Sequence, residues 1–213
     1  MTAGTTIVAI SRQKGSGGAH IGQVVAERRG MRFVDGGLLR DASEYLLVHD
    51  PNLEKVKERI GTWWDTMAGA LAMGGMSGLG MLPVDTMQEA ESARLERRII
   101  EEMAGHHSAV IVGRGAGHVL KGRPGVLRVF VHAPEAWRID RVAERSGVNQ
   151  AKARDVVRES DRDRAGFMRA LTGTDWTDAR QYDLAIDAAS TGLEVATDIV
   201  LQLVPLAQAT PPR

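Results

Sequence analysis

The spacing of hydrophobic positions changes repeatedly along this chain, and each change marks an expected element of secondary structure. Short apolar runs, typical of buried strands, alternate with stretches in which apolar residues recur every three or four positions, as on one face of a helix. The expected strands are residues 5–11, 31–35, 108–113, 126–132 and 182–188. The expected helices are residues 18–29, 38–47, 53–60, 87–103, 134–147, an arginine-rich helix within 148–172, and 192–204.

The order of these elements predicts the architecture. Strands that alternate with helices imply a parallel α/β sheet joined by right-handed crossovers, here five-stranded, flanked by helices and contained in one domain over residues 1–213. In the first helix, Ile21, Val24 and Val25 are expected to face the sheet. Ligands of such sheets bind at the carboxyl ends of the strands. Two glycine-containing segments, residues 15–18 and 113–115, follow such ends directly.

Composition narrows the class of protein without identifying it. The chain has 213 residues, of which 43% are apolar and 25% charged, as in an ordinary globular protein. Lys plus Arg and Asp plus Glu number 27 each, so no overall charge favours nucleic acid or membranes, and an anion site must come from a local cluster of basic side chains. Because the chain has no cysteine, disulfides, thiolate metal sites and a cysteine nucleophile are excluded, which fits a reducing compartment.

Two segments bear on localisation. The first residues, MTAGTT, lack the basic and apolar regions of a signal peptide. Residues 67–84 are about as long as the shortest membrane span, but several glycines and Pro83 interrupt them. We therefore expect a cytoplasmic protein that does not span a membrane. Trp63, Trp64 and the Met/Gly-rich segment 67–84 indicate packing or a surface for homo-oligomer formation, with a mobile substrate cap as the alternative.

The strongest candidate site is the segment between the first strand and the first helix. Gly15, Ser16, Gly17 and Gly18 stand there, and glycines at this place allow backbone N–H groups to turn toward a phosphate at the positive end of the helix. A tight turn between strand and helix also favours glycine, and this remains the alternative. The combination of buried strand, four Gly/Ser positions and immediate helix favours the phosphate site.

A second candidate is the arginine-rich helix. Arg154, Arg158 and Arg162 recur every four residues and stack three like charges on one face, which is unfavourable unless an anion or acidic side chains lie beside them. Asp155 and Glu159 each precede an arginine by three residues, so a salt-bridged solvent-exposed face explains the pattern equally well. The helix also suits a lid that closes arginines over transferring phosphates.

Two further side chains follow strand ends. Arg114 comes directly after the strand at 108–113 and lies between Gly113 and Gly115, which favours a role facing a ligand. Asp35 ends the second strand, but the two glycines that follow make it equally a turn residue. Histidines and carboxylates show no metal-ligand spacing, and no G-x-S-x-G segment supports a serine hydrolase.

Taken together, the segments ISRQKGSGG, FVDGGLL, VIVGRGAG, LRVFVHAP, SDRDRA and YDLAIDAASTG resemble the cytidylate kinase-like family, relatives of the nucleoside monophosphate kinases with the P-loop fold. The resemblance covers nearly the whole chain. It implies a core that binds ATP with Mg²⁺, an acceptor-binding insert at residues 38–104 and a lid region at residues 148–172. It also implies that the partners are nucleotide substrates.

The resemblance assigns roles residue by residue. The implied phosphate cradle consists of Gly15, Ser16, Gly17 and Gly18. The implied acceptor-binding residues are Asp35, Arg114, Asp161 and Arg164. The implied lid arginines, which would stabilise the transferred phosphoryl group, are Arg158 and Arg162.

The chain departs from the family pattern next to the glycines. Ala19 and His20 stand where the usual loop has a lysine and then Ser or Thr, and neither can bind the β- and γ-phosphates or supply a hydroxyl to magnesium. Lys14 and Arg12 precede the glycines and can bring positive charge from the other side; we expect Lys14 to act as the replacement cation. The family pattern also has an arginine soon after the position of Asp35. The first arginine after Asp35 in this chain is Arg40, which is displaced from that position. The sequence does not identify the magnesium ligands.

Two classes of function follow. The first is ATP-dependent phosphoryl transfer to a nucleoside monophosphate, with CMP or dCMP as the leading acceptor. The second is a nucleotide-binding or regulatory protein on a kinase fold with little or no transfer. Ala19 and His20 favour the second class, whereas the retained Arg114, Asp161 and Arg164 favour the first. A kinase for a different small acceptor is a third possibility.

Overall fold

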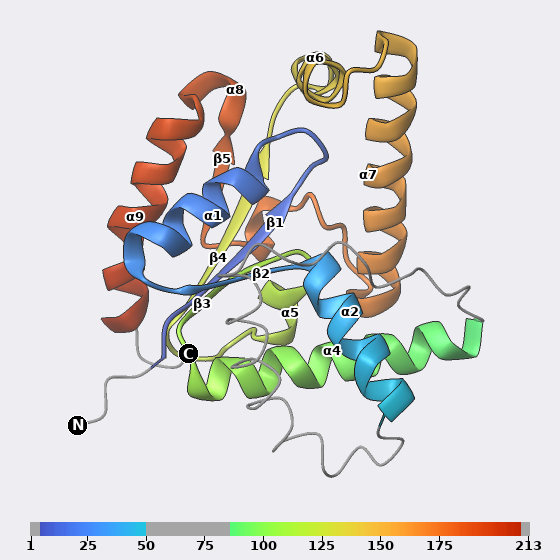
Figure 1. Cartoon of the computed structure of the whole chain (residues 1–213). Coiled ribbons are helices and arrows are strands. Elements are labelled where there is room, and N and C mark those ends of the chain that lie inside the picture. Colours follow the sequence, from blue (N-terminus) through green and yellow to red (C-terminus); the bar gives the residue numbers. More distant parts are fainter. Residues whose placement is uncertain (1–4, 50–85, 210–213) are drawn as a thin grey trace. The chain divides into compact units, whose positions relative to one another are not determined.

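The computed structural model describes residues 5–49 and 86–209, which belong to two compact units (Figure 1). The first unit comprises Met1–Asp35 and His107–Arg213, and the second is Gly36–His106. The insert predicted at residues 38–104 falls within the second unit, and its acceptor-binding role stays a prediction. The expected helix at 53–60, the two tryptophans Trp63 and Trp64, and segment 67–84 lie outside the described residues.

A five-stranded parallel sheet forms the centre of the first unit, as the sequence predicts. The strands are β1 (Ile7–Arg12), β2 (Arg32–Asp35), β3 (Ala109–Val112), β4 (Val126–His132) and β5 (Leu184–Asp187), in the spatial order β2-β3-β1-β4-β5. Ile10 of β1 pairs in register with Val112 of β3 and Val129 of β4. This strand order places β1 in the middle of the sheet. Because every pairing is parallel, the carboxyl ends of all five strands lie at one edge.

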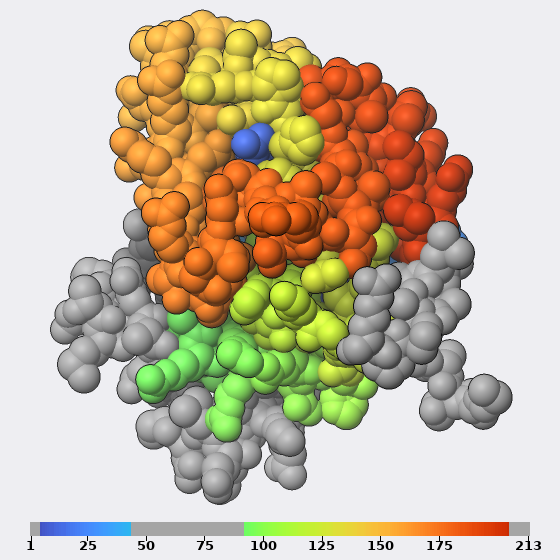
Figure 2. Space-filling view, turned by 180° about the vertical axis from the view of Figure 1, so that it is seen from behind, coloured from blue at the N-terminus to red at the C-terminus, as the bar shows by residue number. Residues whose placement is uncertain are grey.

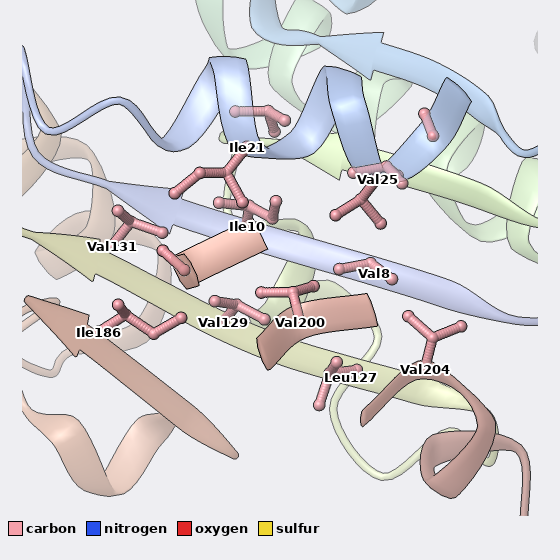
Figure 3. Close-up of a cluster of buried hydrophobic side chains, with 14 of the residues drawn as sticks. Val8, Ile10, Ile21, Val25, Leu127, Val129, Val131, Ile186, Val200 and Val204 are labelled. Carbon is pink, nitrogen blue, oxygen red and sulfur yellow. The ribbon is translucent and has the colours of Figure 1, made fainter. Parts of the chain in front are cut away.

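Helices α1 (Gly18–Arg29) and α9 (Leu193–Ala209) cover one face of this sheet (Figure 1). Figure 3 shows the interface, where Ile21 and Val25 of α1 meet apolar side chains of the strands. The strand and α9 residues of this cluster that Figure 3 labels are Val8, Ile10, Leu127, Val129, Val131, Ile186, Val200 and Val204. Val24, expected to face inward, is only half-buried, because the buried side of α1 is centred on Ile21, Val25 and Ala26.

The opposite face of the sheet carries the short helix α5 (Ala116–Val119) and a group of aromatic rings. Phe130 of β4 stacks on Tyr182 at 5.0 Å between ring centroids and meets Trp176 edge-on at 5.7 Å. The Tyr182 hydroxyl donates a hydrogen bond to the Trp176 carbonyl at 2.7 Å. These rings tie residues 176–182 to β4. The short helices η1 (Ala179–Gln181) and α8 (Ala188–Thr191) flank β5.

Two helices follow β4 and pack on each other. Helix α6 (Glu135–Ser146) starts after Pro134 and ends at Gly147, which has φ 63°; α7 (Gln150–Thr172) starts at Asn149, whose side chain accepts a hydrogen bond from the Lys152 amide at 2.9 Å. The two helices share a small apolar cluster made by Ile139, Val142, Ala153 and Val157. The bounds of α7 lie within residues 148–172, the predicted lid region.

In the second unit, α2 (Gly36–His49) packs on α4 (Thr86–His106), and the hydroxyls of Ser43 and Ser92 lie 2.7 Å apart between them. Leu39 of α2 and Leu95 of α4 are buried. Over the described part of the chain, no helix combines the length and the apolar character needed to cross a membrane.

Helix α1 approaches the sheet so closely at Gly22 that a side chain there has no room. A Cβ on Gly22 would lie 2.9 Å from Cγ2 of Val112 and 3.1 Å from Cδ1 of Ile10. We therefore predict that Gly22→Ala lowers the free energy of unfolding by about 1 to 3 kcal/mol, although alanine favours helix formation over glycine. Urea denaturation measures this.

The matched control is Gly166→Ala in α7, because nothing lies within 4 Å of a Cβ at Gly166. Here the gain in helix propensity is unopposed, and stability should rise by about 0.5 to 1 kcal/mol. A Gly22→Ala protein as stable as the Gly166→Ala protein would contradict the close approach of α1 to the sheet.

Candidate active site

The segment between β1 and α1 forms a tight loop at the carboxyl edge of the sheet. We call residues 13–18 the glycine loop. Gly15 and Gly17 adopt positive φ values of 84° and 87°, which favour glycine. The amide of Gln13 donates to the Val131 carbonyl at 3.1 Å, and the Gln13 side-chain oxygen accepts a hydrogen bond from the Ala133 amide at 3.2 Å. The entry of the loop is thereby fixed to the end of β4.

The glycines of the loop are required by close neighbours as well as by φ. A Cβ on Gly15 would lie 2.6 Å from the Arg138 carbonyl oxygen, and one on Gly18 would lie 2.6 Å from Cβ of Arg12. A Cβ on Gly17 would overlap the Leu193 side chain. The loop is therefore packed from several sides while its backbone stays close to the start of α1, as a phosphate cradle requires.

Ser16 serves the loop itself. Its side chain is fully buried, and its hydroxyl donates a hydrogen bond to the Gln13 carbonyl at 2.9 Å. This bond closes the turn internally, and the Ser16 amide donates to the same carbonyl at 3.2 Å, so both donors of Ser16 serve the loop itself. The neighbouring Ala19 and His20, in the first turn of α1, are exposed.

Four cationic side chains meet at this edge of the sheet, and we call Arg12, Lys14, Arg114 and Arg164 the cation cluster. Burial and then the charge of Arg164 lower the pKa of Arg12 to about 10. Arg114 acts on Arg12 in the same direction, and Asp35 in the opposite one. Burial also lowers the pKa of Lys14, with further contributions from Arg164, Arg12 and Arg145. Desolvated like charges held together in this way favour binding of an anion.

The cluster joins three elements. Arg12 ends β1 and its guanidinium lies directly against Gly113, where any Cβ would overlap it. Arg114 follows Gly113 and has φ 53°, the only positive φ of a non-glycine residue in the described chain. Its neighbours Gly113 and Gly115 have φ 92° and 65°. Three consecutive left-handed residues are unusual, and such backbone conformations gather at functional sites.

Arg164 belongs to α7, and burial lowers its pKa. It lies 3.4 Å from Oδ1 of Asp161, measured from Nη1. Asp161 also accepts a hydrogen bond from the Lys14 amide at 2.9 Å and one from Nη1 of Arg138 at 2.6 Å. The structure thus brings together Asp35, Arg114, Asp161 and Arg164 with Lys14 at one edge of the first unit; whether they bind an acceptor stays a prediction.

The other arginines of α7 lie on its exposed side. Arg154, Arg158 and Arg162 are exposed, as the solvated-face alternative predicts. Nε of Arg158 donates to Oε1 of Glu135 on α6 at 2.7 Å, and this hydrogen bond lowers the pKa of Glu135. The partner acid comes from α6, not from the preceding turn of α7 as the sequence suggests. Catalytic roles for Arg158 and Arg162 remain predictions.

Sequence reasoning did not identify Arg138 and named Arg12 only as a source of charge. Arg138 is 5% exposed and contacts the backbone of the glycine loop, yet in the sequence it is one of several arginines in an amphipathic helix. Its signal is the position itself, since an arginine among the core-facing residues of α6 must be paired. Arg12 could have been found because it is the last residue of the central strand.

The residues described by the structure do not include a group of three or more His, Asp or Glu side chains that could hold a metal ion. Magnesium in phosphoryl-transfer sites commonly keeps several waters and takes its other ligands from one or two carboxylates and the nucleotide phosphates. A nucleotide-borne Mg²⁺ is therefore compatible with this edge of the sheet, where Asp35 lies near Arg12.

Comparison with known proteins gives related kinases. A cytidylate kinase from Halobacterium salinarum is 30% identical over 115 residues, which are 54% of this chain and 59% of that protein. One from Ignicoccus hospitalis is 21% identical over 201 residues, 93% of this chain and 98% of the other. The chain spans about half the length of three of the curated relatives that it matches, namely 59%, 54% and 44%.

Among solved structures, an uncharacterized protein from Eubacterium ventriosum has a TM-score of 0.70 at 21% identity, covering 94% of this chain and 99% of that one. This likeness supports the fold. The family model for the cytidylate kinase-like family matches residues 7–190. Since that match includes the whole sheet, the glycine loop and the cation cluster, the protein belongs to the cytidylate kinase-like family.

Proposed function

We propose that this protein transfers the γ-phosphoryl group of ATP to a nucleoside monophosphate, with CMP or dCMP as the leading acceptor. The observation that carries the proposal is the cation cluster at the glycine loop. Burial and mutual repulsion disfavour the charges of Arg12, Lys14 and Arg164, and the polyphosphate of a nucleotide relieves both effects. Family membership supports the same class of reaction, and we propose the cytoplasm as its place.

The residues divide between donor and acceptor. Backbone N–H groups at Gly15, Gly17 and Gly18 face the donor phosphates at the start of α1, and Lys14 with Arg12 supplies the charge that a loop lysine usually brings. Arg114 and Arg164 hold the acceptor phosphate, with Asp35 on the acceptor side of the cluster.

The reaction needs no covalent intermediate. An oxygen of the acceptor phosphate attacks the γ-phosphorus, the bond from that phosphorus to the β–γ bridging oxygen breaks, and ADP leaves with the electron pair. The cations stabilise charge on the transferred group in a site with little water. Bound with ATP, Mg²⁺ supplies further neutralisation of the β- and γ-oxygens. Arg158 and Arg162 join as lid arginines, for which Arg158 must leave Glu135, and an exposed ion pair of this kind costs little to separate.

The alternative is a nucleotide-binding or regulatory protein with little transfer. Ala19 and His20 favour it, because both are exposed in the first turn of α1 and neither supplies the ammonium or the hydroxyl of the usual loop. A kinase for another small acceptor differs from the proposed function only in the acceptor that it phosphorylates. The assay described next separates these three functions.

Incubation with Mg-ATP and a panel of nucleoside monophosphates should yield CDP or dCDP faster than any other diphosphate, measured by direct chromatography of the products. The control is Arg114→Met, purified identically, which should reduce the rate by about tenfold or more because one of the two cations that hold the acceptor phosphate is lost. This control excludes a contaminating kinase. No diphosphate from any acceptor, with Mg-ATP still bound, would leave the binding-protein alternative.

Replacing Lys14 tests the substitute cation. The pKa of Lys14 is lowered, because burial and neighbouring cations disfavour its charged form. The charge of Lys14 therefore destabilises the folded protein at neutral pH. Lys14→Met should therefore weaken Mg-ATP binding by about tenfold or more and leave the melting temperature unchanged or higher. Calorimetric titration and thermal unfolding measure the two effects.

The matched control for Lys14→Met is Lys152→Met, which removes an exposed lysine from the start of α7 and should change neither quantity. If Lys14→Met binds Mg-ATP as tightly as the unmodified protein, Lys14 is not the replacement for the loop lysine.

The lowered pKa values also predict how nucleotide affinity depends on pH. A cation whose pKa is lowered loses its proton at a lower pH than an exposed group, so Mg-ATP affinity should be constant near neutral pH and fall as the solution becomes alkaline. In Lys14→Met the fall should be shallower, since one of the two titrating cations is lost and Arg12, with a pKa of about 10, remains. Titrations between about pH 7 and about pH 10 measure it; identical pH profiles for the two proteins would contradict the assignment.

A further inference from the structure

Both main-chain polar groups of Lys14, in the glycine loop, are held by the helices that follow β4. The amide of Lys14 donates to Oδ1 of Asp161 on α7 at 2.9 Å. The carbonyl of Lys14 accepts a hydrogen bond from Nη1 of Arg138 on α6 at 3.0 Å. At the next residue, Gly15, the backbone of α6 comes so close that a Cβ would lie 2.6 Å from the Arg138 carbonyl oxygen. Both helices thus hold the entry of the loop, and we call these contacts to the Lys14 main chain the grip.

Arg138 and Asp161 also bind each other. Nη1 of Arg138 lies 2.6 Å from Oδ2 of Asp161, and the two side chains are 6% and 20% exposed. Nε of Arg138 donates to the Ala133 carbonyl at 2.9 Å, which fixes the guanidinium at the start of α6. An ion pair this well covered and this fully hydrogen-bonded holds a defined geometry, in contrast to an exposed pair.

The surface view agrees with this arrangement. From behind, yellow α6 and orange α7 cover the region, and only a small blue patch from the N-terminal part of the chain shows among the yellow atoms (Figure 2). The ion pair between Arg138 and Asp161 is itself largely covered, at 6% and 20% exposure.

We propose that Asp161, with Arg138 as its partner, is a positioning residue for the glycine loop: it holds the Lys14 peptide and thereby sets the geometry of the donor-phosphate cradle. The resemblance implies that Asp161 contacts the acceptor instead. Oδ1 accepts from the Lys14 amide and lies 3.4 Å from Nη1 of Arg164, while Oδ2 accepts from Arg138, so both carboxylate oxygens are already engaged within the protein.

The direction of the Lys14 N–H group determines which amides of the loop can bind a nucleotide. Because this N–H points to Asp161 and the Ser16 amide donates to the Gln13 carbonyl, the amides left to face a phosphate are those of Gly15, Gly17 and Gly18. When Asp161 and Arg138 no longer hold it, the main chain on either side of Lys14 can rotate, and the cradle loses its preset shape, which weakens the donor complex. The inference rests on the proposed function for its ligand, but the grip itself is a property of the free protein.

Asp161→Asn tests the role, because it removes the charge that holds Arg138 while keeping the shape of the side chain. We expect the affinity for Mg-ATP to fall by about tenfold or more and the affinity for CMP to change less than about threefold, both measured by calorimetric titration. Contact with the acceptor predicts the reverse order and would overturn the proposal. The matched control is Asp155→Asn, an exposed acid on the same helix, which should leave both affinities unchanged.

Amide hydrogen exchange tests the grip without any ligand. In the free protein the Lys14 amide should be protected, and Asp161→Asn should speed exchange across residues 13–18 while leaving the strands of the sheet unchanged. Unchanged exchange in the loop would overturn the proposal. If the unmodified protein binds no nucleotide, the proposed function fails, and the exchange experiment still decides the grip.

Removal of Asp161 leaves Arg138 buried without its acid, so a single variant can fail to fold. The double variant Asp161→Asn with Arg138→Gln avoids an uncompensated charge and should be more stable than Asp161→Asn, as thermal unfolding measures. It should nevertheless show the same fast exchange at residues 13–18, because the charge-assisted hydrogen bonds from both helices to the Lys14 main chain are then lost. Restored protection in the double variant would contradict the inference.

Discussion

The central position of β1 in a parallel sheet is the constraint on which the rest of this structure depends. With β3 on one side and β4 on the other, the first strand has no free edge, and Ile7, Val8 and Ile10 are almost fully buried. Whatever follows β1 must leave the sheet at its carboxyl edge and return over one face as α1. The glycine loop performs that turn. Its position against β4 and α6 follows from where the central strand ends.

That geometry explains why the cations gather. Arg12, Arg114 and Asp35 all follow or end parallel strands, so the sheet brings them to one edge although they are distant in sequence. Arg164 arrives from α7, which α6 and the aromatic rings around Phe130 anchor to the same unit. Burial of such charges disfavours the unliganded protein, and Asp161 and Asp35 offset only part of it. Under the proposed function, the polyphosphate of a nucleotide supplies the missing negative charge.

The sequence predicted most of the fold because parallel strands buried on both faces are continuous apolar runs, which are easy to recognise. All five strands and helix α1 were located from such patterns. The strand order was not predicted, because pairing depends on contacts between distant residues. Within the site, the glycines and Arg114 were identifiable from their place at strand ends. Arg138 was not, because its partners are the backbone of Lys14 and the carboxylate of Asp161, two positions that only the folded chain brings together.

The structure also offers a reason why Ala19 can stand where the usual loop has a lysine. A lysine after the glycines would approach the phosphates from the first turn of α1, whereas Lys14 and Arg12 approach from the end of β1. A cation on the strand side is useful only if the loop entry is rigid, since a one-peptide rotation at Lys14 would redirect both its side chain and the amides that follow. Asp161 and Arg138 supply that rigidity by holding the Lys14 main chain. Under the proposed function, the same residue offers its side chain to the donor while α6 and α7 hold its backbone, which couples the placement of charge to the packing of these two helices.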